Sequence, residues 1–183
     1  QIGDGTYAPA KNIRTLTVNK ADQAIIFPAP GTKTYGDPDF NLGATASSGL
    51  MVSYSSDNLA VATVSGATVH ITGAGTAIIT ASQGGNDLYY SAIDINATLK
   101  VNKAVQTITF GALGPKTYGD PDFNAGAIAS SSLPVTYTSN NTDVATVSGN
   151  MIHINGTGNV IITATQTGNA NYFPAPDIQQ GLI

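Results

Sequence analysis

Apolar and polar residues alternate along short stretches of this chain, and turn-forming residues separate the stretches. Side chains of a β-strand point alternately to its two faces, so a period of two predicts strands with one buried face. No stretch shows the 3.6-residue period of an amphipathic helix. In the first half of the chain, the apolar positions that share a face are Ile25 and Phe27, Val52 and Tyr54, Val69 and Ile71, and Ala77, Ile79 and Ala81. We expect these side chains to form the core of a β-sandwich.

The stretches are short and β-branched, and Gly, Asn, Asp, Ser and Pro lie between them at the spacing typical of a sandwich. The strands predicted for the first half are 22–28, 39–47, 50–56, 59–65, 67–72, 76–83 and 92–101. The second half follows with the same spacing. Seven strands per unit is the count of an immunoglobulin-like fold, so we predict an all-β chain of two tandem immunoglobulin-like β-sandwich domains.

The sequence repeats itself with an offset of 83 residues. Val-Asn-Lys-Ala at 18–21 recurs at 101–104, and Lys-Thr-Tyr-Gly-Asp-Pro-Asp-Phe-Asn at 33–41 recurs at 116–124. The alignment needs no insertion or deletion, and about 50 of the 83 aligned positions are identical. We therefore predict repeat 1 at 18–100 and repeat 2 at 101–183, with one fold used twice.

Residues 1–17 resemble the end of a repeat, because the pattern of 1–7 returns at 83–89 and 166–172. The simplest interpretation is that the chain is a segment of a longer array and that 1–17 is the tail, or last strand, of a preceding repeat. An orphan strand of this kind seeks a sheet edge. It motivates one hypothesis for function, an extracellular filament assembled by strand donation.

The junction at 99–104 contains neither Gly nor Pro, so the last strand of one domain could continue directly into the next. This predicts a stiff hinge and an elongated rod. Each domain should add roughly 35 to 45 Å to its length, given about 3.3 Å per strand residue.

Composition narrows the function. Charged residues make up 10% of the chain, the net charge is −4 and the seven Lys and Arg residues are scattered, which argues against nucleic acid as a partner. No apolar run is long enough to span a membrane, so we expect no direct membrane insertion. The chain has no cysteine, which removes disulfides, thiolate metal sites and thiol nucleophiles.

The stretches 52–66 and 69–81 resemble the bacterial immunoglobulin-like (Big) domain pattern, and Lys-Thr-Tyr-Gly-Asp-Pro-Asp-Phe at 33–40 resembles its MBG-type subset. The resemblance covers nearly the whole chain. It implies tandem repeats of large secreted bacterial surface proteins and adhesins, an extracellular or cell-surface location, and stalk or adhesive roles. Implied partners are neighbouring repeats of the same chain and glycans or host and environmental surfaces. The resemblance supplies no catalytic residues.

The motif Tyr-Gly-Asp-Pro-Asp-Phe is the most specific feature of each repeat. Its carboxylates, Asp37 and Asp39 in repeat 1 and Asp120 and Asp122 in repeat 2, could supply oxygen ligands to Ca²⁺. An EF-hand run is absent and each site has few carboxylates, so we favour a turn in which Gly and Asp-Pro set the backbone. The sequence therefore predicts no cofactor, with Ca²⁺ as the alternative.

Other polar residues also favour structural interpretations. His70 and His153 alternate with apolar neighbours and should face solvent, and one histidine per domain makes a poor metal site. No Ser, His and acid cluster recurs, so we expect no enzyme. Lys33 suggests an isopeptide crosslink with an asparagine, but we place Lys33 in a polar turn, away from the buried site that such a bond requires.

Paired aromatic residues enter the last strand of each repeat. These are Tyr89 and Tyr90 in repeat 1 and Tyr172 and Phe173 in repeat 2. Exposed rings could stack on sugars, but one ring of each pair should point inward, so we favour core anchors.

The sequence thus predicts a non-catalytic structural and adhesive stalk segment of a bacterial cell-surface repeat protein, which spaces or presents an adhesive region. Repetition would supply avidity that a single domain lacks. The alternatives are a carbohydrate-binding or Ca²⁺-dependent adhesion module in each repeat, and the strand-donation filament.

Overall fold

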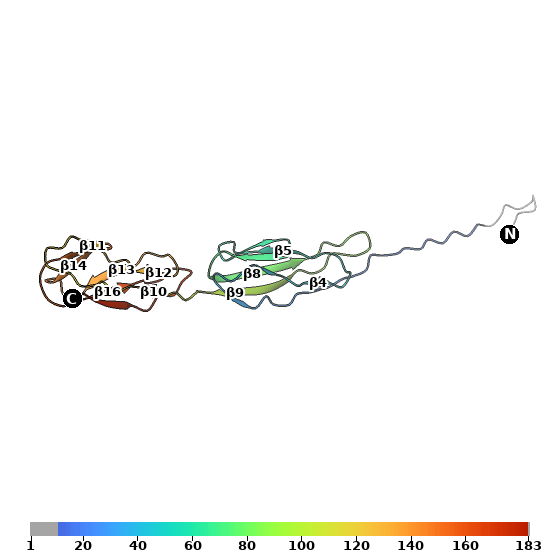
Figure 1. Ribbon diagram of the computed structural model, residues 1–183. Coiled ribbons are helices and arrows are strands. Elements are labelled where there is room, and N and C mark those ends of the chain that lie inside the picture. Colours follow the sequence, from blue (N-terminus) through green and yellow to red (C-terminus); the bar gives the residue numbers. More distant parts are fainter. Residues whose placement is uncertain (1–10, 183) are drawn as a thin grey trace, which may run out of the picture.

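The computed structural model describes residues 11–182, and every regular element in that range is a β-strand. Two sandwiches lie end to end, joined by a short extended segment (Figure 1). Within the described range, no helix is long and apolar enough to cross a membrane. The strands of the first sandwich are β1 (Ile25–Ile26), β2 (Thr32–Thr34), β3 (Phe40–Asn41), β4 (Thr45–Ala46), β5 (Ser53–Ser56), β6 (Ala62–Ser65), β7 (Thr68–Ile71), β8 (Gly75–Ser82) and β9 (Ile95–Asn102).

The second sandwich repeats most of this order. Its strands are β10 (Ile108–Thr109), β11 (Phe123–Asn124), β12 (Ile128–Ala129), β13 (Thr136–Ser139), β14 (Ala145–Ser148), β15 (Met151–Ile154), β16 (Val160–Thr165) and β17 (Ile178–Leu182).

Each sandwich has two main sheets. In the first, the order β2-β9-β8-β5 faces β3-β7-β6, and β1 pairs separately with β4. In the second, β13-β16-β17 faces β11-β15-β14, and β10 pairs with β12. The predicted fold class, an all-β chain of tandem immunoglobulin-like sandwiches, is confirmed.

The core of each repeat lies between its own two sheets, and the two core clusters have no residue in common. In repeat 1, Val69 of β7 and Ile79 of β8 are fully buried and meet Leu99 of β9. The neighbouring Ile78 is 40% exposed, as a period of two requires. The face predicted from alternation is therefore confirmed in β7 and β8.

One predicted strand was wrong. The range 39–47 forms two strands, because β3 pairs with β7 while β4 pairs with β1 in another sheet. Between them, the backbone N–H of Ala44 donates to the Tyr54 hydroxyl at 2.9 Å instead of joining a ladder. The Ala127 amide and the Tyr137 hydroxyl repeat this contact at 2.9 Å in the second sandwich. A side-chain partner thus allows the chain to change sheets here.

The placement of Lys33 in a polar turn was also wrong. Lys33 lies in β2, which pairs in parallel with Lys100–Asn102 at the end of β9. Its ammonium nitrogen lies 4.4 Å from the centre of the Phe40 ring, within the range of a cation–π contact. The equivalent residues of repeat 2, 115–117, form no strand.

The predicted N-terminal tail is described only in part, since residues 1–10 lie outside the described range. Residues 11–20 are exposed, form no strand and extend away from the first sandwich (Figure 1). A β-strand needs a hydrogen-bonded neighbour, and residues 11–17 lie against none here. The assignment of 1–17 as the last strand of a preceding repeat stays a prediction. Assembly by strand donation stays a prediction.

Candidate functional site

Asp37 closes the turn that follows β2. Its carboxylate Oδ2 accepts a hydrogen bond from the Thr34 amide at 2.8 Å, and its own amide donates to the Thr34 carbonyl at 3.0 Å. Asp120 makes the same two contacts with Thr117, at 2.9 and 3.0 Å. The first aspartate of the motif therefore stabilises a backbone turn in each repeat.

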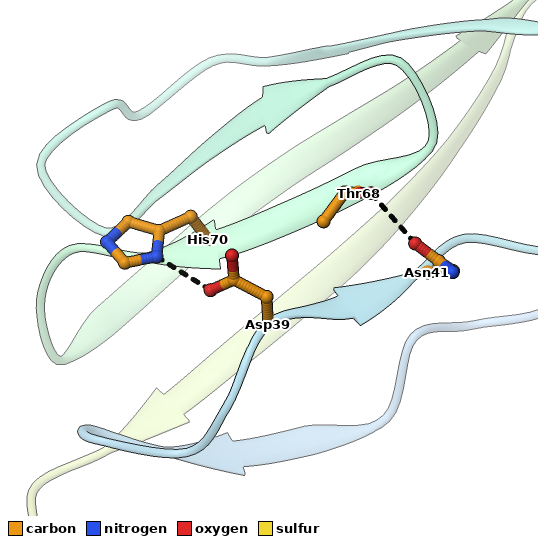
Figure 2. Close-up of polar contacts among 4 residues, drawn as sticks. All are labelled: Asp39, Asn41, Thr68 and His70. Carbon is orange, nitrogen blue, oxygen red and sulfur yellow. Dashed lines mark hydrogen bonds and ion pairs between the residues drawn. The ribbon is translucent and has the colours of Figure 1, made fainter.

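Asp39 has a different partner. Figure 2 shows its carboxylate directed at the His70 ring, with 2.7 Å between Oδ1 and Nδ1. Asp122 and His153 form the same pair at 2.6 Å. The His70 side chain is 62% exposed, so the prediction that the histidines face solvent is confirmed. Sequence reasoning missed the pairing, although both partners recur with the period.

A second contact beside this pair is confined to the first repeat. The Thr68 hydroxyl donates to Asn41 Oδ1 at 2.9 Å (Figure 2). Met151 replaces Thr68 in the second repeat, and Asn124 Oδ1 accepts instead from the Gly126 amide at 2.8 Å. The aspartate–histidine pair is thus the part of this surface that both repeats share.

The four aspartates offered as Ca²⁺ ligands already have partners in the protein. Ca²⁺ takes six to eight oxygen ligands. Within residues 11–182, no group of three or more His, Cys, Asp or Glu side chains is placed to hold a metal ion. Ca²⁺ binding at this loop would have to displace the turn contact or the histidine, and it stays a prediction.

The aromatic pairs lie on a loop that polar side chains hold in place. In repeat 2, Asn169 Oδ1 accepts from the amides of Asn171 and Tyr172 at 2.8 and 2.9 Å. The buried Gln106 amide group donates to Gln166 Oε1 at 2.6 Å and to the Phe173 carbonyl at 2.8 Å. Repeat 1 uses Asn86, Gln23 and Gln83 in the same way. The loop is therefore preorganised in both repeats.

The two rings of each pair differ in exposure. Tyr90 is 50% exposed and Phe173 is 48% exposed, while Tyr89 and Tyr172 are half-buried. We expected the ring of Tyr172 to anchor the core of its own repeat, but it does not. It packs edge-on against Tyr35 of the first repeat, with 5.4 Å between ring centres and 84° between planes. This loop is therefore part of a contact between the repeats.

Further contacts of the same loop fix the junction. The Asn171 side-chain oxygen accepts from the Ala74 amide of repeat 1 at 2.9 Å. The Lys103 ammonium group donates to the Asn169 carbonyl at 2.7 Å, and the Ala104 amide donates to the Asn171 carbonyl at 2.9 Å. Strand β9 leads directly into this segment. The end of repeat 1, the linker and the loop of repeat 2 thus form one contact site, which we call the junction.

No family model matches this sequence, and no curated protein sequence matches it either. The resemblance to Big-type repeats therefore rests on the motifs quoted above.

Several solved structures are similar to this chain at low sequence identity. Drosophila N-cadherin EC1-4 is 13% identical, with 87% of this chain and 49% of that chain covered and a TM-score of 0.36. Surface layer protein SbsC, domains 1-6, is 16% identical, with 90% and 28% covered and a TM-score of 0.37. Sidekick-1 immunoglobulin domains 1-5 are 13% identical, with 91% and 39% covered and a TM-score of 0.34. This chain spans half or less of each of these three, and the likeness concerns the fold alone.

Proposed function

We propose that this chain is a non-catalytic structural and adhesive stalk segment of an extracellular, bacterial cell-surface repeat protein. Its role is to space or present an adhesive region away from the surface. The observation that carries the proposal is the junction, where a strand, a linker and a preorganised loop set the direction of one repeat relative to the next.

A stalk needs repeats that keep their direction. A linker of Gly and Ser would let two domains reorient freely. Here β9 reaches Asn102, and the Lys103 and Ala104 contacts follow at once. The Tyr35–Tyr172 and Ala74–Asn171 contacts then attach the second repeat away from the linker axis. Contacts at separate points resist both bending and rotation.

Small-angle X-ray scattering tests this role directly. We expect the chain to have the maximum dimension of two sandwiches end to end, about 35 to 45 Å longer than one alone. The control is a variant with three glycines inserted between Lys103 and Ala104, which keeps both cores and removes the fixed direction. A compact profile for the unmodified chain, or one that the insertion leaves unchanged, would contradict the proposal.

A second candidate function is sugar binding by the loop. Its support is the equivalent exposure of Tyr90 and Phe173, because exposed rings stack on sugar faces. A glycan array with the unmodified chain and the Tyr90→Ala and Phe173→Ala variants tests it. Binding that both substitutions weaken would establish a lectin-like module. Silence on the array, and in calorimetry with Ca²⁺, would leave the stalk alone.

A further inference from the structure

A pocket of about 200 Å³ opens at the end of repeat 2 that lies away from repeat 1. It is lined on one side by Lys116 and Tyr118 and on another by Gly156 and Thr157, with Leu182 of β17 among the remaining lining residues. Nothing within residues 11–182 fills this pocket.

The same surface of repeat 1 is covered. Its equivalents by the 83-residue offset are Tyr35, Gly73 and Ala74, and repeat 2 places Asn171 and Tyr172 on them. The fit is close, since a Cβ on Gly73 would lie 3.3 Å from Asn171 Oδ1. The pocket on repeat 2 is therefore the counterpart of one half of the junction.

Two differences between the repeats match this relation. Tyr35 is half-buried against Tyr172, whereas Tyr118 is 66% exposed. The Ala74 amide donates to Asn171 Oδ1, whereas the Thr157 amide donates to no acceptor within the described part of the chain. A ring and an amide that have partners at the junction thus stand free at the far end.

The occupant can be specified from the two loops in this chain. Repeat 2 presents Asn171 and Tyr172, but repeat 1 has Leu88 and Tyr89 at the equivalent positions. A leucine cannot accept a hydrogen bond, so the loop of repeat 1 could offer the ring contact alone. A repeat of the second type offers both contacts.

We propose that the pocket beside Tyr118 and Thr157 is a docking site for the Asn-Tyr loop of a further repeat, of the type of repeat 2, in the same chain. The inference rests on the proposed stalk function. It means that successive repeats of the stalk are joined by the same contact, in which the Asn-Tyr loop of one repeat binds the end of the preceding repeat. One hydrogen bond and one ring pair are too few for association of separate chains. A direct linkage raises the effective concentration of the loop to the millimolar range or above, and docking then follows.

The test extends the full chain by a copy of residues 101–183 joined after Ile183, which preserves the period. Segmental ligation leaves the added repeat unlabelled, so that the NMR spectrum contains only the signals of the original two repeats. Amide exchange of Thr157 can then be compared directly with the two-repeat chain. We expect the Thr157 amide to exchange about tenfold more slowly than in the two-repeat chain, because it gains an acceptor. Ala74 is the internal reference and should not change.

The matched control replaces the added copy of Asn171 by leucine, the residue of repeat 1. The exchange rate of the Thr157 amide should return to its value in the two-repeat chain, while the ring of Tyr118 should stay shielded from solvent by the tyrosine of the added loop. Equal Thr157 rates in the extended chain and this control would overturn the docking site, provided that circular dichroism shows the added repeat folded. An unfolded added repeat would overturn it too, because a copy of repeat 2 must fold to act as a connector. Small-angle scattering of the same samples tests the stalk function separately. An elongated chain whose Thr157 amide is unprotected would support the stalk function and contradict the docking site.

Discussion

Asp39 and His70 show how the period places exposed side chains in register on neighbouring segments. The solvent-facing position of His70 was predictable, since it alternates with the apolar Val69 and Ile71. Its partner was not predictable, because the pairing of β3 with β7 had to be known first. The same limit applies to Asp37. The sequence around it predicts a turn, but it does not predict that the Thr34 amide donates to the Asp37 carboxylate.

The aspartate–histidine pair should contribute little to stability. Both side chains are more than half exposed, and exposed ion pairs contribute about 0.2 to 1 kcal/mol. We expect Asp39→Ala to lower the free energy of unfolding by less than about 1 kcal/mol. A double-mutant cycle with His70→Ala in urea measures the coupling. A coupling above about 2 kcal/mol would show that solvent does not screen the pair.

Gly85 provides a sharper prediction, because its neighbour is a matched control. Gly85 has a φ of +76°, and an added Cβ would lie 2.5 Å from the Tyr89 carbonyl oxygen. Gly84 has no atom within 4 Å of such a Cβ. We expect Gly85→Ala to destabilise repeat 1 by about 1 to 3 kcal/mol and Gly84→Ala to change stability by less than about 0.5 kcal/mol. Urea denaturation of both variants checks the difference, and equal effects would contradict it.

At the scale of strands, alternation was informative where a strand is long and pairs on both sides. Strand β8 is the best case, with Ala77, Ile79 and Ala81 buried as predicted. It was uninformative for β2, whose residues Thr32–Thr34 show no apolar alternation. That strand forms because β9 offers it a parallel edge, which is a tertiary effect that propensity does not encode.

Adjacent isoleucines of β8 test the buried face. We expect Ile79→Ala to lower the free energy of unfolding of repeat 1 by about 2 to 5 kcal/mol, because it leaves a cavity between the sheets. Ile78 is 40% exposed, so Ile78→Ala should cost about 1 kcal/mol or less. Thermal or urea unfolding of the two variants gives the comparison. A larger loss of unfolding free energy from Ile78→Ala than from Ile79→Ala would contradict the assignment of Ile79 to the buried face of β8.

For the whole molecule, the sequence showed the period and predicted a stiff linker, but it did not predict the contact between the repeats. The contact between Tyr172 and Tyr35 joins residues far apart in the chain, so it cannot be recognised from the sequence. From the sequence, Tyr172 was therefore assigned to the core of its own repeat. The recurrence of Tyr89 at the equivalent position supports either interpretation equally. Only the three-dimensional arrangement of the junction separates them.

Loosening the junction should change orientation without changing the cores. We expect Asn171→Leu combined with Tyr172→Ala to increase motion between the repeats while each repeat keeps its fold, since neither side chain belongs to the core cluster of repeat 2. Residual dipolar couplings fitted separately to the two repeats give the measurement. The unmodified chain should fit one alignment tensor and the variant should require two. A single tensor for both would show that the linker alone fixes the direction.

The parallel pairing of β2 with β9 also governs how the protein carries a mechanical load. The chain enters repeat 1 ahead of β2 and leaves it at the end of β9, so tension between the two ends pulls these strands in opposite directions along their length. Their hydrogen bonds lie across the strands and must break together in shear. In single-molecule force spectroscopy, we therefore expect repeat 1 to unfold only at the force that breaks this parallel pair.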